Sequence, residues 1–145
     1  MENKQYKDNM NKTEQIIKCS VDFVIATCCL IFFSPLAIAC AIAIRLEDGL
    51  PVIYRQERIG LHGKPFFIYK FRSMKIDAEK DGPDLLEIKG DPRLTKVGRF
   101  LRMHHLDELP QLWNIFKGDM AFVGPRPERK YYIDQIIKHD PRYTY

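Results

Sequence analysis

The chain has 145 residues, a formal net charge of +4 and 46% hydrophobic residues. This length fits one domain, and so apolar a composition can bury a core, which excludes a wholly disordered chain. Its 8 glycines and 9 prolines are too few for a collagen-like or linker-like protein.

A long apolar tract follows the polar residues 1–15. Between Asp22 and Arg45 lie 22 residues without charge, which as a straight helix would reach about 33 Å. That length matches a bilayer hydrocarbon core of roughly 30 Å. The tract begins too late for a signal peptide, and no small-residue cleavage site follows it. We therefore predict a membrane-embedded segment over residues 16–48, in which the cysteines are small apolar fillers: Cys19, Cys28, Cys29 and Cys40.

The Ser34-Pro35 pair lies at the midpoint of this tract. Proline removes a backbone donor and clashes with the carbonyl group four residues earlier, so a kink or break is expected there. The Ser34 hydroxyl can bond one of the freed carbonyls. Because basic residues flank the tract on both sides, the positive-inside rule does not choose an orientation. Two topologies stay open: a single crossing, and a re-entrant helix that returns to the same face.

Two strands and a charged surface are expected next. Pro51–Tyr54 and Phe66–Phe71 have strand composition, and a glycine-containing turn separates them. Between positions 51 and 76 the single acid is Glu57, and there are six basic residues: Arg55, Arg58, Lys64, Lys70, Arg72 and Lys75. Such a segment favours phosphates, nucleic acid or anionic lipid headgroups as partners.

Three helices are expected after a surface loop over residues 77–92. Leu94–Met103 is basic and amphipathic, which is typical of a helix at a membrane interface. Because Pro110 is tolerated only in the first turn of a helix, the second is expected over Asp107–Phe116. The third is expected over Glu128–Lys138. The predicted fold class is α+β, mainly helical: an apolar membrane helix, either crossing or re-entrant, is followed by a small domain with a β-hairpin and amphipathic interfacial helices.

Asp107 and Glu108 are the candidate chemical groups. Placed at a helix start, two adjacent carboxylates can recruit a divalent cation, usually Mg²⁺ when the substrate carries a diphosphate. Arg99 and Arg102 lie within one helical turn of each other and can meet phosphate oxygens. The same residues also suit an ordinary helix N-terminus and a solvated face, so the pattern alone does not decide.

A second candidate is Arg126, which stands between Pro125 and Pro127 on a stiff backbone. A structural turn before the next helix explains the same residues. The four histidines, His62, His104, His105 and His139, lack ligand spacing and are expected to take no part in catalysis.

The order of several motifs resembles that of a known family. They are Pro51–Gly60, Phe67–Met74, Asp91–Arg102, Leu106–Asn114, Lys117–Met120 and Val123–Pro127. Over about residues 16–145 the chain resembles the bacterial sugar transferases, the monotopic polyprenyl-phosphate phosphoglycosyl transferases. In that family the Ser34-Pro35 position is the break of a re-entrant membrane helix.

This resemblance implies transfer of a sugar 1-phosphate from a UDP-sugar to undecaprenyl phosphate, with release of UMP. The reaction would take place at the cytoplasmic face of the bacterial inner membrane and initiate exopolysaccharide, capsule, O-antigen or glycoprotein glycan assembly. The implied partners are the UDP-sugar, undecaprenyl phosphate and membrane lipid, without nucleic acid; a homodimer is left open.

The resemblance also implies residue roles. Asp107 is the nucleophile that forms a phosphosugar–aspartyl intermediate, and Glu108 is a catalytic residue and ligand of the Mg²⁺ cofactor. The implied substrate- and phosphate-binding residues are Arg99, Arg102, Pro125, Arg126 and Pro127.

The expected organisation is a polar segment over 1–15, a re-entrant helix over 16–48 and a catalytic domain over 49–145. Family members continue with a segment resembling a Lys-Pro-Gly-Ile-Thr motif, so the catalytic domain is expected to be short at its C-terminus. The rival hypothesis is a catalytically inactive, membrane-anchored remnant that serves as an interaction or scaffold protein. A nucleic-acid binder would explain the basic charge but not the apolar tract.

Overall fold

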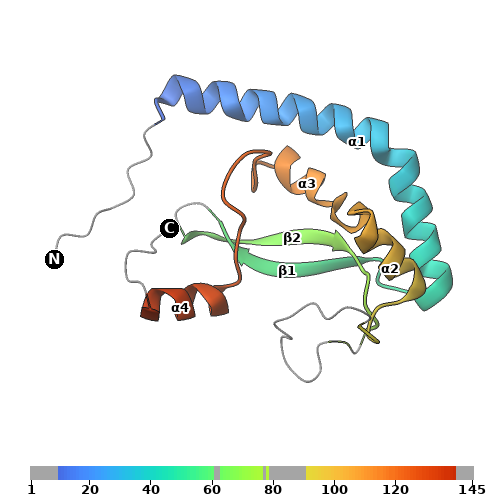
Figure 1. Cartoon of the computed structure of the whole chain (residues 1–145). Helices are drawn as coiled ribbons and strands as arrows, with labels where there is room; N and C mark the ends of the chain where they lie inside the picture. The colour runs from blue at the N-terminus through green and yellow to red at the C-terminus, as the bar shows by residue number, and fades with distance from the viewer. Residues whose placement is uncertain (1–9, 61–62, 77, 79–90, 140–145) are drawn as a thin grey trace.

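The computed structural model describes residues 10–60, 63–76, 78 and 91–139. Nearly all of the predicted loop over 77–92, and positions 1–9 of the polar segment, lie outside these residues. Figure 1 shows a long N-terminal helix beside a two-stranded hairpin, with short helices between the two and a last helix beyond the hairpin. The fold is α+β and mainly helical, as predicted.

Helix α1 spans Lys12–Asp48 and contains Pro35 in its interior. At its start, the Asn11 backbone N–H donates to the Glu14 carboxylate at 2.9 Å, and Gly49 ends it with a φ of 73°. The Ser34 hydroxyl donates to the Ile31 carbonyl at 2.8 Å, which is the carbonyl that loses its partner because Pro35 has no N–H. This confirms the expected role of Ser34. Figure 1 shows α1 bending while remaining helical, so the predicted kink is present as a bend within one helix.

The apolar surface of α1 is largely uncovered. Its most apolar 18-residue stretch has a mean hydropathy of 2.4 and is 11% buried, and Phe32 is 77% exposed. The helix is long and apolar enough to cross a membrane. Apolar surface of this extent is more stable against lipid than against water, which supports membrane association. A bent helix is compatible with both the crossing and the re-entrant topology, so the re-entrant form stays a prediction.

Strands β1 (Ile53–Ile59) and β2 (Pro65–Phe71) form the antiparallel hairpin. In its register Tyr54 pairs with Lys70 and Arg58 with Phe66. The first strand continues well past the predicted end at Tyr54, because pairing with β2 satisfies its backbone as far as Ile59. The Ile59 N–H donates to the Glu128 carbonyl at 2.9 Å, which brings the chain before α4 to the hairpin.

In the described part of the chain after the hairpin there are four short helical segments: α2 (Lys96–Met103), the 3₁₀ helix η2 (Leu106–Glu108), α3 (Gln111–Phe116) and α4 (Lys130–His139). The prediction of one helix over Asp107–Phe116 was wrong. Tight i→i+3 bonds, such as Leu109 N–H to the Leu106 carbonyl at 3.2 Å, form the first turn, and α-helix begins only after Pro110. Proline cannot donate to the preceding turn, so the segment divides there.

The C-terminal part of α1 belongs to the core of the domain. Cys40 and Ile44 of α1 are buried against Phe71 of β2 and Leu101 of α2. The Glu47 carboxylate accepts from the Lys96 and Val97 backbone N–H groups, both at 2.7 Å, and so covers the free donors at the start of α2. The apolar helix α1 and α2 are therefore connected by both packing and hydrogen bonds.

Gly98 permits the close approach of α2 to the end of β2. A Cβ atom at this position would lie 1.9 Å from the Ser73 carbonyl oxygen, so a larger residue would force the backbones apart. The close approach also allows a side-chain hydrogen bond between the two segments, because Arg102 Nε of α2 donates to Ser73 Oγ at 2.9 Å. This bond positions Arg102 for the site.

Candidate active site

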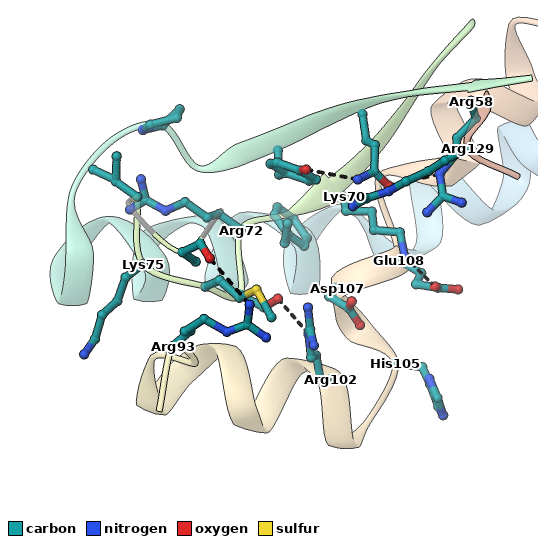
Figure 2. A pocket seen from close by; sticks show the side chains of 18 of the residues that line it. Arg58, Lys70, Arg72, Lys75, Arg93, Arg102, His105, Asp107, Glu108 and Arg129 are labelled. Carbon is teal, nitrogen blue, oxygen red and sulfur yellow. Dashed lines mark hydrogen bonds and ion pairs between the residues drawn. The ribbon is translucent and has the colours of Figure 1, made fainter. Parts of the chain in front are cut away.

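A cleft of about 750 Å³ lies between the hairpin, η2 and the residues before α4. Its lining includes two carboxylates, Asp107 and Glu108, and a set of basic residues: Arg58, Lys70, Arg72, Lys75, Arg93, Arg102, Arg126 and Arg129. Figure 2 shows Asp107 in the middle, with Lys75 and Arg93 to one side and Arg58 and Arg129 to the other. Eight cations around two anions favour a ligand with several negative charges.

Both carboxylates come from η2. Residues of a 3₁₀ helix are turned about 120° from one another, so the two side chains point in different directions, as Figure 2 shows. Asp107 is 8% exposed. Burial raises the pKa of Asp107, Glu108 adds to the increase, and Lys70 and Arg102 oppose it. A carboxylate with little hydration is a stronger nucleophile than a hydrated one.

Glu108 is more open and is held by cations. Its Oε1 accepts from Lys70 Nζ at 2.9 Å and lies 3.5 Å from Arg126 Nη2. Burial acts to raise the pKa of Glu108, but the hydrogen bond and charge of Lys70, with the charge of Arg126, outweigh it and the pKa is lowered. Glu108 is therefore the carboxylate kept ionised by its surroundings.

Lys70 is positioned through the fully buried Asn114 of α3. The Asn114 amide donates to the Phe67 carbonyl at 2.7 Å, and its oxygen accepts from the Tyr69 N–H at 3.0 Å. Asn114 thus takes the place of a neighbouring strand along β2 and satisfies its backbone there. The next residue, Lys70, then reaches Glu108 across the cleft.

Three side chains of β1 form a hydrogen-bonded row beside the site. Gln56 Nε2 donates to the Tyr54 hydroxyl at 3.1 Å, and Arg58 Nε donates to Gln56 Oε1 at 3.0 Å. Arg58 also donates to the Pro127 carbonyl at 3.3 Å and pairs with Glu128 at 3.5 Å. The Pro-Arg-Pro segment is consequently attached to the hairpin at the edge of the cleft.

The structure brings together some of the predicted site residues. Arg102, Asp107, Glu108 and Arg126 all line the cleft. Arg99 is an exposed residue of α2 and is not among the described lining residues. Pro125 and Pro127 line a neighbouring, more apolar pocket near the start of α1 instead.

Sequence reasoning named Arg58 and Lys70 only as members of a basic segment that favours anionic partners, and it missed Arg129; all three line the cleft. A signal was available in β1, because Tyr54, Gln56 and Arg58 alternate and must share one face of a strand. His105, for which no catalytic part was expected, lines the cleft and turns the chain from α2 into η2 with a φ of 55°.

The carboxylates fit a magnesium ion better than a zinc ion. Among the described residues, no group of three or more His, Cys, Asp or Glu side chains comes together. Structural and catalytic zinc sites need such a group. Mg²⁺ is commonly held by one or two carboxylates together with substrate phosphates and water. Glu108, which is ionised and accessible beside Asp107, can supply the carboxylate ligand that such a site takes from the protein.

Comparison with known proteins agrees with this chemistry. The family model described as "Bacterial sugar transferase" matches residues 13–145. A Bacillus subtilis protein, named provisionally as an undecaprenyl-phosphate N-acetylgalactosaminyl 1-phosphate transferase, is 47% identical over 88% of the chain. An Aeromonas hydrophila UDP-N-acetylgalactosamine-undecaprenyl-phosphate N-acetylgalactosaminephosphotransferase is 43% identical over 89% of it. The Escherichia coli UDP-glucose:undecaprenyl-phosphate glucose-1-phosphate transferase is 44% identical over 84%.

These matches cover different shares of the relatives. The chain spans 71% of the Bacillus subtilis protein, but 30% of the Aeromonas protein and 26% of the Escherichia coli protein. The named sugars also differ, although the identities are nearly equal.

Proposed function

The chain belongs to the bacterial sugar transferase family of phosphoglycosyl transferases, and on that premise we propose that it transfers a sugar 1-phosphate from a UDP-sugar to undecaprenyl phosphate. The observation that carries the proposal is the pairing of Asp107 and Glu108 within a strongly basic cleft. The cleft suits a diphosphate, and the uncovered apolar helix α1 suits a lipid-linked acceptor.

The reaction is proposed to proceed in two displacements. A carboxylate oxygen of Asp107 attacks the phosphorus bonded to the sugar, and the bond from that phosphorus to the UMP oxygen breaks, so UMP leaves with the bonding electron pair. An oxygen of undecaprenyl phosphate then attacks the same phosphorus. The bond to Asp107 breaks, which yields the lipid diphosphosugar and restores the carboxylate.

The basic residues carry the electrostatic part of this mechanism. Asp107 can approach an anionic diphosphate only if the positive charge of Lys70, Arg102 and Arg126 offsets their repulsion. Glu108 would hold Mg²⁺, which when bound neutralises charge on the diphosphate. Asn114 maintains Lys70 in place through the backbone of β2.

The function is tested by release of UMP from a panel of UDP-sugars with glucose, galactose, N-acetylglucosamine or N-acetylgalactosamine. We expect UMP to appear with undecaprenyl phosphate in detergent or lipid, and one donor to be preferred. Reactions without acceptor or without protein are the controls. If a folded, membrane-inserted chain releases no UMP from any donor, the remnant or scaffold hypothesis is the better one.

For the membrane segment we propose the re-entrant topology, with the catalytic domain at the cytoplasmic face of the inner membrane. Its support is the basic residues on both sides of the apolar tract, which a hairpin that returns to the same face would place on one side of the membrane. The bend in α1 is compatible with this topology. An undecaprenyl-linked product at this face would serve the first membrane step of glycan assembly.

This topology makes a labelling prediction. In a variant without native cysteines, single cysteines at Lys12 and Leu50 should both react with a membrane-impermeant reagent only after the cytoplasmic face is exposed. Replacing Pro35 with alanine should shift the chain toward spanning, because an uninterrupted helix of this length can cross the bilayer. Labelling of the two positions from opposite faces would establish a true crossing.

A further inference from the structure

The two ends of the cleft differ in chemistry. Figure 2 shows Arg58 and Arg129 at one end and Arg72, Lys75 and Arg93 toward the other, with Asp107 between them. The first end is polar, because Tyr54 and Gln56 are hydrogen-bonded in a row with Arg58, and Arg126 precedes Pro127, whose carbonyl accepts from Arg58. Toward the second end, the apolar lining residues Met74 and Ile76 flank Lys75 in the chain, and Pro51 precedes Val52, whose carbonyl accepts from the Arg72 N–H. A ligand bound at the second end would meet positive charge and apolar surface together.

Arg72 is an unusual component of the second end. Its side chain is 7% exposed, and its Nη2 pairs with Asp48 at 3.1 Å and donates to the Asp48 and Gly49 carbonyls at 2.7 and 3.1 Å. The other two guanidinium nitrogens, Nε and Nη1, are buried without a hydrogen-bond partner in the described part of the chain. Buried donors without partners are costly, so their place in a cleft lining points to an anionic ligand that satisfies them.

Lys75 adds an accessible charge to this end. It is exposed and lines the cleft, and its backbone N–H donates to the Arg93 carbonyl at 3.0 Å. The neighbouring bridge between Met74 and Leu94 fixes the same segment. Arg93 is already paired with the buried Asp91 through its side chain, and the hydrogen bonds from its side chain and backbone N–H lower the pKa of Asp91 to about 2. The mobile cation offered to a ligand here is therefore Lys75 rather than Arg93.

The second end also adjoins the apolar helix. Arg72 is attached directly to Asp48, the last residue of α1. Leu46 and Leu50, two residues before and after Asp48 in the chain, are 82% and 63% exposed, and Ile76 of the cleft lining is 65% exposed. A phosphate that carries a long hydrocarbon chain matches this arrangement, because its head would meet Arg72 and Lys75 while its chain follows apolar surface. A nucleotide has no hydrocarbon chain to pack against that apolar surface.

We propose that the Arg72–Lys75 end of the cleft binds the phosphate of the polyprenyl phosphate acceptor, whereas the nucleotide of the donor occupies the Arg58–Arg126–Arg129 end. This assignment rests on the proposed function. It places the nucleoside of the donor and the hydrocarbon chain of the acceptor in different ends of the cleft. The acceptor oxygen enters in line with the bond from phosphorus to Asp107, at the position that the UMP oxygen has left.

The two displacements can be measured separately. Exchange of labelled UMP into UDP-sugar without acceptor reports the donor end alone, and kcat/KM for undecaprenyl phosphate reports the acceptor end. For Lys75→Gln we expect the ratio of acceptor kcat/KM to exchange rate to fall about tenfold, because one charge-assisted contact to phosphate is lost. Arg72→Lys keeps a cation beside Asp48 but removes the unpartnered Nε and Nη1 donors, so it should also lower the ratio. Arg129→Gln should change it in the opposite direction.

Lys138→Gln, which removes the same charge from the exposed surface of α4, is the matched control and should leave the ratio unchanged. The assays use neutral phosphatidylcholine micelles and are repeated with anionic phosphatidylglycerol and with inorganic phosphate as competitor. If Lys75→Gln lowered the ratio only in anionic lipid, Lys75 would contact bulk lipid headgroups and the proposal would be overturned. It would also be overturned if Lys75→Gln lowered the exchange rate as much as acceptor kcat/KM. Absence of exchange in an unmodified chain that still transfers sugar 1-phosphate would contradict the two-displacement mechanism, and absence of both exchange and transfer would contradict the proposed function.

Discussion

Replacement of Asp107 with asparagine is expected to remove both turnover and UMP exchange, by at least about a thousand-fold. An amide of nearly the same shape keeps the buried position but is not a nucleophile toward phosphorus. The covalent route also predicts that UMP is released before the acceptor binds. Incubation with a UDP-sugar alone, followed by acid quenching and peptide mass mapping, should detect a phosphosugar on Asp107 in the unmodified chain and none in Asp107→Asn.

Two comparisons make this result specific. Asp134→Asn, an exposed carboxylate of α4, should keep both adduct and turnover. Glu108→Gln should retain a weak adduct, since the attacking atom is still present. The contrary result would be that an unmodified chain with measurable transfer activity releases UMP only when donor and acceptor are both present. Direct transfer would then be the better mechanism, and Asp107 would not be the nucleophile.

Removal of divalent cations is expected to abolish activity, and Mg²⁺ should restore it. In Glu108→Gln we expect the Mg²⁺ concentration for half-maximal activity to increase by about tenfold or more, because the ionised oxygen that would bind the cation is replaced by a neutral amide. Activity is measured over a Mg²⁺ titration after treatment with a chelator. The titration midpoint is the informative quantity, because Glu108→Gln also removes the partner of Lys70 and can lower kcat separately.

Glu57→Gln, which removes a carboxylate from an exposed position of β1 outside the cleft lining, should leave the titration midpoint unchanged. Full activity of Glu108→Gln without added metal would rule out the ligand role. A midpoint that moves equally in both variants would indicate a general charge effect instead of a defined site.

The sequence determined those features that depend on neighbours along the chain. The uncharged tract required a long apolar helix, and Pro35 required a bend whose freed carbonyl Ser34 can satisfy three residues away. The composition of Phe66–Phe71 indicated a strand, and the basic amphipathic pattern of Leu94–Met103 indicated the helix α2. These predictions succeeded because backbone hydrogen bonds, caps and amphipathic periods are local, and their residues are close in sequence.

Only the tertiary structure decided which charges meet. Lys70 and Glu108 are 38 positions apart, and their contact depends on Asn114 holding β2 beside α3. The 3₁₀ geometry of η2, the burial of Arg72 against Asp48 and the exclusion of Arg99 from the described cleft lining likewise follow from packing. A sequence pattern fixes the period of a strand or helix but not the register and distance at which separate elements meet. Long-range ion pairs and a cleft with two different ends therefore had to come from the fold.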